Sequence, residues 1–353
     1  MMIFAVVVLA AGCSKVEVVK TPEKEISFTV GNYAPATKAV VVTEFTSFKS
    51  KGYLYAEGVA DAQNFFGTDG ETITFNGTDT WAPQSHPYYW PKSANSYINF
   101  ISWYANDGSA DIVPNTVSQT SFEINGRTIG ANDNILIADA AWHQTNNQNQ
   151  YYTVGVPTLF HHVLSRVKIN VKATTLTDPN LAGVTYEIAI QSAHLEGVFQ
   201  TGTMKLVNNE MAVTGTSEWR SNTSPTLLWT TVSGSNASNI QLNSNPSVGT
   251  TPTAILPERS VLPQNLGETV RLVFTYSVTT KSNGNLTSIE TGIPASFVLN
   301  TIKNTSDFPI NQWVPNKKYI YNIAINPIGN EILLNPIVES DWTFADDLNA
   351  TVE

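Results

Sequence analysis

Few residues in this 353-residue sequence could carry chemistry, and a histidine pair is the first candidate. His161 and His162 are adjacent in "FHHVLSRVKINVKA", while His86, His143 and His194 lie far from them in sequence. Imidazole is a common zinc ligand, but successive side chains on a strand point to opposite faces. The pair also lacks a companion motif with a third ligand. The sequence therefore predicts no metal site and no cofactor, and His162 is expected to pack or to form a hydrogen bond.

Paired carboxylates could supply the acid and the base of glycoside hydrolysis. Asp346 and Asp347 lie in a polar tail, where a solvated pair is the ordinary expectation. Asp133 and Asp139 flank "NILIA" and are expected to be polar residues at the ends of a strand. The sequence contains no G-x-S-x-G, H-E-x-x-H or P-loop pattern. We therefore expect no catalytic residues and no enzyme.

Aromatic residues gather between positions 88 and 104, where they could stack on sugar rings. Large aromatic side chains in β-domains most often fill the core, so packing is the simpler expectation. A non-polymerising, glycan-binding surface lipoprotein is kept as the alternative function. The residues concerned are Tyr88, Tyr89, Trp90, Tyr97, Phe100, Trp103 and Tyr104.

Cys13 is the only cysteine, which excludes an intrachain disulfide and a multi-cysteine metal site. The apolar run before it, residues 3–11, is shorter than the ~20 residues that span a bilayer. Such a run is typical of the apolar region of a secretory signal. Secreted chains seldom keep an unpaired thiol, so this thiol calls for a specific role.

The small residues "AAG" directly before Cys13 resemble the bacterial lipobox. In that pattern the cysteine thiol receives diacylglycerol, and a peptidase cuts the chain before it. We expect residues 1–12 to be a lipoprotein signal peptide, Cys13 to be lipidated and residues 13–24 to form a tether. An ordinary signal peptide with an incidental cysteine is the alternative.

Composition narrows the class of protein further. Charged residues make up 14%, against an average of about 25%, and the formal net charge is -10. Low charge combined with many Asn, Thr, Ser and Gln residues is typical of secreted β-proteins. The negative charge argues against nucleic acid as a partner, because phosphate binding needs clustered Lys and Arg.

Residues of alternating polarity follow one another from "EISFTV" at 25–30 to "EILLNPIV" at 331–338. The clearest alternation is in "SRVKINVKA", where Val167, Ile169 and Val171 are expected to be buried and Lys168 and Lys172 exposed. No segment shows a sustained helical period, so helices should be short and few.

Turn residues separate these segments, including the pairs Asn76-Gly77, Asn125-Gly126 and Asn283-Gly284. Asn-Gly favours tight hairpins because both residues tolerate positive φ. Short strands at this spacing predict two tandem β-sandwiches, one over residues 25–174 and one over 175–353.

Several segments resemble the fimbrillin family of Bacteroidetes, the type V pilins and related fimbrial lipoproteins. The resemblance implies two transthyretin-like Greek-key β-sandwich domains. It also implies export to the outer membrane and the cell surface, and a role in a fimbrium or in adhesion. The segments are "YYWPKSANSYINFISWY" at 88–104, "DNILIADA" at 133–140, "FHHVLSRVKINVKA" at 160–173, "WVPNKKYIYNIAI" at 313–325 and "VESDW" at 338–342.

The resemblance further implies assembly by strand complementation. In related pilins a trypsin-like protease removes the first strand, and a strand of another subunit fills the vacancy. Here the removable strand would be "EISFTV", with Ile26, Phe28 and Val30 on one face, expected at an open edge. Cleavage would fall between Lys38 and Ala39. The implied partners are other pilin subunits, the protease, the outer membrane through the lipid, and a ligand on a host or bacterial surface.

Two alternatives remain open. "EISFTV" could stay in place as the first strand of a membrane-tethered domain. The donor strand could be "EILLNPIVESDW" at 331–342 or the tail with Phe344, Leu348 and Val352, so the stalk, anchor or tip role is undecided.

Overall fold

Strands dominate the computed structural model of the chain. The two helices among the described residues are the single 3-10 turns Pro179–Leu181 and Leu299–Thr301, and none there is long and apolar enough to cross a membrane. The prediction of an all-β fold is confirmed. The structure describes residues 24–32, 45–78, 80–93, 95–108, 112–114, 122–139, 141–144, 155–174, 179–206, 217–221, 240–242, 253–302, 310–328 and 331–339.

The N-terminal strands form one sheet in the order β10-β6-β9-β11-β1-β5-β4-β2-β3. Because β2 also pairs with β6, seven of these strands close into a barrel-like ring. The strands are β1 (Phe28–Asn32), β2 (Ser47–Tyr55), β3 (Gln63–Asn64), β4 (Glu71–Phe75), β5 (Trp81–Pro83), β6 (Tyr97–Ala105), β9 (Ile135–Ala138), β10 (Ala141–Gln144) and β11 (Val156–His162).

The closed ring differs from the predicted sandwich of two separate sheets, and β2 is the reason. Its first residues, Ser47–Ser50, pair with β4, while Lys49–Tyr55 pair with β6. A nine-residue strand is long enough to bridge both neighbours, and closure removes free edges from the ring. Aromatic and aliphatic side chains fill the interior.

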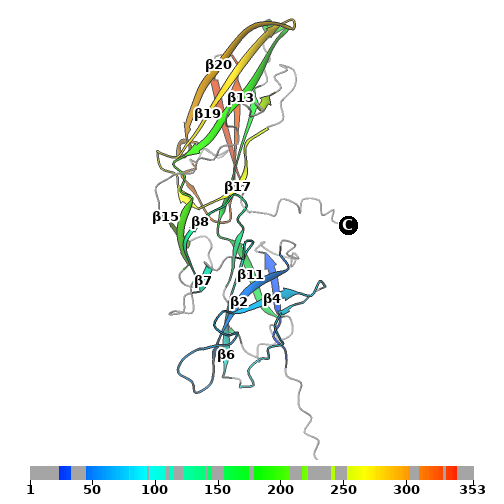
Figure 1. The fold of residues 1–353 in the computed structure, drawn as a ribbon, viewed down its shortest axis with the longest axis vertical. Helices are drawn as coiled ribbons and strands as arrows, with labels where there is room; N and C mark the ends of the chain where they lie inside the picture. The colour runs from blue at the N-terminus through cyan, green and yellow to red at the C-terminus, as the bar shows by residue number, and fades with distance from the viewer. Residues whose placement is uncertain are drawn as a thin grey trace, which may run out of the picture.

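The C-terminal strands form two four-stranded sheets that share one hydrophobic core. One sheet has the order β17-β12-β22-β23 and the other β16-β13-β19-β20. Figure 1 shows an elongated molecule with β13, β19 and β20 at one end and the barrel at the other. The strands are β12 (Ser165–Ala173), β13 (Val184–Glu196), β16 (Ile240–Leu242), β17 (Thr253–Val261), β19 (Arg271–Ser282), β20 (Asn285–Val298), β22 (Lys318–Asn326) and β23 (Glu331–Glu339).

The alternation expected in β12 is present. Val167, Ile169 and Val171 are fully buried in the shared core. Lys168 and Lys172 lie on the opposite face, but they are half-buried where full exposure was expected. β12 is an interior strand of its sheet, because it pairs with both β17 and β22, so side chains of the two neighbouring strands flank the lysines on that face.

Hydrogen bonding crosses the boundary expected at residue 174. β12 precedes the boundary and pairs with β17 and β22, which follow it. β8 likewise pairs with β14 in the small sheet β15-β14-β8-β7. The division into two domains stays a prediction, but residue 174 does not separate the sheets. The remaining strands are β7 (Ile112–Pro114), β8 (Phe122–Thr128), β14 (Thr201–Leu206), β15 (Ser217–Ser221), β18 (Gln264–Asn265) and β21 (Gln312–Trp313).

The three Asn-Gly pairs adopt different structures. Asn283 and Gly284 have φ of 50° and 83° and join β19 to β20 in a two-residue hairpin, as predicted. Gly77 lies in a five-residue loop between the paired residues Phe75 and Trp81. The prediction of a hairpin at Asn125-Gly126 is wrong, because both residues lie inside β8, where the register with β14 shifts. The positive φ of Gly126 there forms a bulge.

Candidate functional site

The first strand, β1, lies between strands that are distant from it in sequence. It runs parallel to β11, with Phe28–Asn32 in register with Val156–Phe160. The amide of Val156 also donates to the carbonyl of Ser27 over 2.7 Å. This flank is therefore bonded along the whole strand.

The other flank of β1 is bonded as well, by two separate pieces of chain. Phe28 pairs with Trp81 of β5. Before the strand begins, the amide of Ile26 donates to the carbonyl of Tyr88 over 2.7 Å, and the amide of Trp90 donates to the carbonyl of Lys24 over 3.1 Å. Backbone partners on this flank therefore reach from Lys24 to Phe28, and those on the β11 flank reach from Ser27 to Asn32.

The expectation that Ile26, Phe28 and Val30 belong to an open-edge strand is therefore wrong. β1 occupies an interior position, because barrel closure leaves β11 and β5 with a gap that one strand fills. Nothing in a local alternating pattern distinguishes an edge strand from an interior one, since both need one apolar face.

The apolar face of β1 points into the barrel core. Ile26, Phe28 and Val30 are 1%, 2% and 7% exposed. The Phe28 ring packs edge-on against Phe100 and Phe48, at centroid distances of 5.4 and 5.7 Å. Burial of three such side chains is worth roughly 5–9 kcal/mol, so the strand is held firmly.

Gly155 lies directly against the backbone at the start of β1, and sequence reasoning missed it. Its φ is +93°, and a Cβ placed on it would lie 2.9 Å from the backbone carbon of Phe28 and 3.1 Å from the oxygen of Ser27. Only glycine fits this combination of backbone conformation and contact. The available signal was its place directly before the apolar strand "VPTLF".

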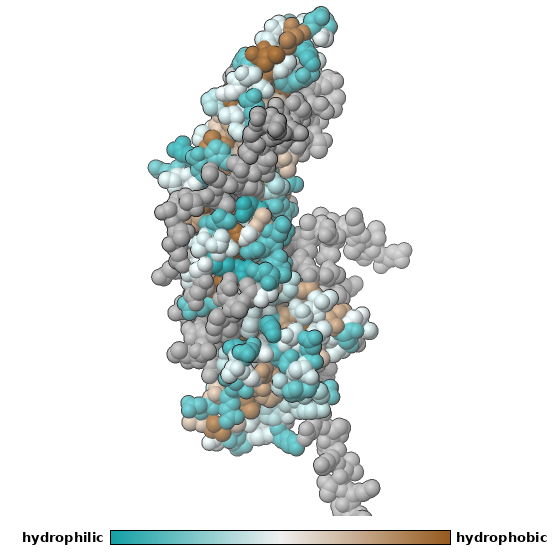
Figure 2. All heavy atoms as spheres, in the orientation of Figure 1, coloured by the Kyte–Doolittle hydropathy of each residue, from teal (hydrophilic) through white to brown (hydrophobic). Residues whose placement is uncertain are grey.

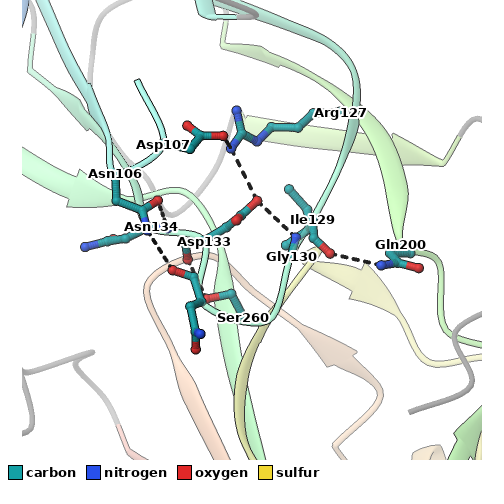
Figure 3. Close-up of polar contacts among 10 residues, drawn as sticks. Asn106, Asp107, Arg127, Ile129, Gly130, Asp133, Asn134, Gln200 and Ser260 are labelled. Atoms are coloured by element: carbon teal, nitrogen blue, oxygen red, sulfur yellow. Dashed lines mark hydrogen bonds and ion pairs between the residues drawn. The ribbon is translucent and has the colours of Figure 1, made fainter. Parts of the chain in front are cut away.

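A polar network joins the barrel to the rest of the fold (Figure 3). Arg127 of β8 is 4% exposed and donates to Asp107 over 2.6 Å and to Asp133 over 3.2 Å. Asp133 also accepts from the amide of Gly130, and its carbonyl accepts from the hydroxyl of Ser260 in β17. Burial lowers the pKa of Arg127, but the two carboxylates outweigh burial and raise the pKa overall. The network therefore connects the loops next to β6 and β9 of the barrel to β8 and β17, and its role is structural.

The histidine pair contacts different partners, as expected for neighbours on a strand. His161 bonds to Asp139 over 3.0 Å, and His162 bonds to the Asn134 side-chain oxygen over 2.9 Å. Burial, with the nearby charges of Arg166 and His161, holds the pKa of His162 well below its usual value. Within the described residues, no group of three His, Cys, Asp or Glu side chains could hold a metal ion.

Asp133 and Asp139 contact different partners. Asp133 pairs with Arg127, whereas Asp139 contacts His161. Both lie just outside β9, as the sequence predicted for polar residues at strand ends.

The aromatic cluster is mainly packing material. Trp90, Phe100 and Trp103 are buried, and Tyr104 stacks on Phe45 with centroids 4.6 Å apart. Of the seven aromatic residues in this cluster, only Tyr89 is exposed, at 39%. One exposed ring is not a platform for sugar stacking, so this cluster gives the glycan-binding alternative no support.

Among the described residues, the two most exposed large apolar side chains lie elsewhere. Leu286 and Ile289 of β20 are 60% and 56% exposed. Figure 2 shows hydrophobic atoms at the tip where Figure 1 places the β19–β20 hairpin. A register shift near Thr287 brings Leu286 and Ile289 opposite Lys281 and Thr279, hence onto one face of the sheet.

Several predicted residues lie outside the described parts of the chain. They are the lipidation residue Cys13, the processing residues Lys38 and Ala39, the carboxylates Asp346 and Asp347, and the tail residues Phe344, Leu348 and Val352.

The fold thus consists of a closed barrel that contains β1 and of a C-terminal β-sandwich. This architecture can be compared with that of known proteins. The family model described as fimbrillin-like matches residues 37–342 of this sequence. The chain belongs to the fimbrillin-like family. Membership confirms the resemblance seen in the sequence motifs, and the match begins just after β1. A comparison with curated protein sequences found no match.

Several solved structures are similar to this chain at low sequence identity. A fimbrial protein from Bacteroides vulgatus ATCC 8482 is 17% identical with a TM-score of 0.52, and the match covers 90% of this chain and 100% of that one. A protein from Bacteroides uniformis ATCC 8492 assigned to cell adhesion is 16% identical, with a TM-score of 0.47 over 91% and 100% of the chains. A fimbrilin from Porphyromonas gingivalis W83 is 11% identical, with a TM-score of 0.39 over 90% and 97%.

Proposed function

We propose that this fimbrillin-like chain is a non-enzymatic fimbrial subunit at the cell surface, and that it joins other subunits by strand complementation. A trypsin-like protease cuts between Lys38 and Ala39, and a strand from another subunit then replaces β1. Family membership supports the fimbrial part of the proposal. Before assembly, lipid on Cys13 tethers the chain to the outer membrane.

One observation supports strand replacement above the others. β1 fills a gap between β11 and β5, and its next neighbour in sequence, β2, is not one of its hydrogen-bonded partners. Without β1, both borders of the gap would present unpaired backbone groups, and the core would lose one wall. Such a gap accepts one strand, with main-chain bonds giving affinity and alternate side chains giving register.

The interior position changes how replacement must proceed. An edge strand could leave freely, whereas β1 has bonded flanks and a buried apolar face. After cleavage at Lys38, β1 would stay bound until an incoming strand competes for its place. Assembly should therefore be slow and should depend on subunit concentration, as in other bimolecular replacements.

Mild trypsin treatment tests the proposal. The wild-type chain should be cut after Lys38, lose residues 24–32 and form heat-sensitive ladders, as read by N-terminal sequencing, gel filtration and electrophoresis. Lys38→Gln should stay monomeric. Lys24→Gln is the matched control, because Lys24 is exposed and precedes β1, so this variant should still assemble. A cut chain that stays monomeric and keeps residues 24–32 even at high subunit concentration and after long incubation would contradict strand replacement, and binding of that monomer on a glycan array would favour the alternative.

A further inference from the structure

The two flanks of β1 are not equally strong. β11 binds the strand through five registered residue pairs. The opposite flank offers the single pair Phe28–Trp81 and then the irregular segment 84–90, which reaches Lys24 and Ile26 through two hydrogen bonds. Segment 84–90 lies outside the strands, and besides its bridge to Glu25 the amide of Gln84 donates to the carbonyl of Thr72 in β4 over 2.8 Å. Beyond Gln84, a further contact must position the residues that reach β1.

Glu71 of β4 makes that contact. The residue is 7% exposed. One carboxylate oxygen accepts from the hydroxyl of Ser85 over 2.5 Å and from the Tyr88 hydroxyl over 3.3 Å. The other accepts from the amides of Thr72 and Ser85, over 2.9 and 3.4 Å. All four donors are neutral, and two of the three residues that supply them lie in segment 84–90.

Tyr88 connects the Glu71 carboxylate to β1. Its ring packs against Phe66 with centroids 4.7 Å apart, and its carbonyl accepts the amide of Ile26. Phe66 in turn lies beside Phe28, at 6.4 Å. A continuous set of contacts therefore links the Glu71 carboxylate to the N-terminal half of the β1 seat.

We infer that Glu71 is a positioning residue that holds segment 84–90 as the second wall of the β1 seat. Ser85 is its main partner, because the 2.5 Å bond is the shortest of the four. This inference has a consequence for assembly, which rests on the proposed function. During strand replacement, β1 separates first from segment 84–90 and last from β11.

Amide hydrogen exchange in the intact, uncleaved chain tests the inference without requiring assembly. Glu71→Gln keeps the size of the side chain and removes the charge, and Ser85→Ala removes the main partner. Because hydrogen bonds to charged groups contribute more than neutral ones, we expect exchange in residues 24–28 and 84–90 to accelerate about 10- to 100-fold in both variants. Protection of β11 should stay unchanged.

Glu57→Gln is the matched control. Glu57 also accepts from a serine hydroxyl and a side-chain amide, those of Ser93 and Asn95, but both partners lie outside segment 84–90. This variant should leave residues 24–28 unchanged. Unchanged exchange there in Glu71→Gln and Ser85→Ala would overturn the inference, as would equal acceleration in all barrel strands, which would assign Glu71 to the barrel as a whole. Failure to form ladders after trypsin would bear on the proposed function alone.

Discussion

Replacement of Gly155 by alanine should loosen β1 selectively. The new Cβ would lie 2.9 Å from the backbone carbon of Phe28 and 3.0 Å from the Thr29 hydroxyl oxygen. Real Cβ atoms essentially never approach a neighbour below 3.0 Å, so the β1 backbone must move. Displacement would pull Phe28 away from its ring contacts and stretch the parallel ladder with β11.

The magnitude has two parts, which a second glycine separates. Alanine at a φ of +93° costs about 1–2 kcal/mol from backbone strain alone, and overpacking adds about 1–3 kcal/mol. Gly77 has a φ of +87°, and nothing lies within 4 Å of a Cβ placed there. Gly77→Ala should therefore show the strain part alone, whereas Gly155→Ala should show the sum, about 2–5 kcal/mol.

Urea unfolding of both variants, with hydrogen exchange to localise the change, measures the difference. We expect Gly155→Ala to lose more stability than Gly77→Ala and to lose protection first in residues 24–32. Equal losses in the two variants, or a loss of protection in Gly155→Ala that spares β1, would refute the steric reasoning.

Three more expected outcomes concern side chains whose surroundings are described. Phe28→Ala should reduce barrel stability by about 3–5 kcal/mol in urea unfolding, while the exposed Thr29→Ala should change it by less than about 0.5 kcal/mol. Because the pKa of His162 is lowered in the folded state, the unfolded chain binds more protons below pH ~6.5, so stability should fall as the pH decreases, by at most ~1.4 kcal/mol per pH unit. In thermal unfolding measured at several pH values, His162→Gln should make stability depend less on pH. An unchanged pH dependence would mean that other groups cause it. Gly284→Ala should cost about 1 kcal/mol because φ is +83° in the hairpin turn, and a neutral result would argue against this turn.

Local pattern in the sequence predicted the all-β class and one strand in detail. Period-2 alternation identified β12 and its buried face, because alternation depends only on the geometry of consecutive residues. The Asn283-Gly284 hairpin was equally local. Asn125-Gly126 was misassigned because a bulge and a turn both need positive φ at glycine, and only the partner strand tells them apart.

The sequence also determined the family, because motifs that resemble those of fimbrillins occur in order along the chain. The sequence did not determine the candidate site. The neighbours of β1 come from β11 and from residues 81–90, and no local pattern encodes which distant segments will pair. The roles of Gly155 and Glu71 follow only from that pairing.

The sequence by itself thus predicted a strand with one apolar face at residues 25–30, since three alternating side chains require burial; the strand found there, β1, spans Phe28–Asn32. Only the tertiary structure decided that this strand lies inside a closed barrel and is bonded on two flanks. The physical reason is that side-chain alternation is a property of neighbouring residues, whereas the position of a strand in a sheet depends on which distant backbone groups meet it.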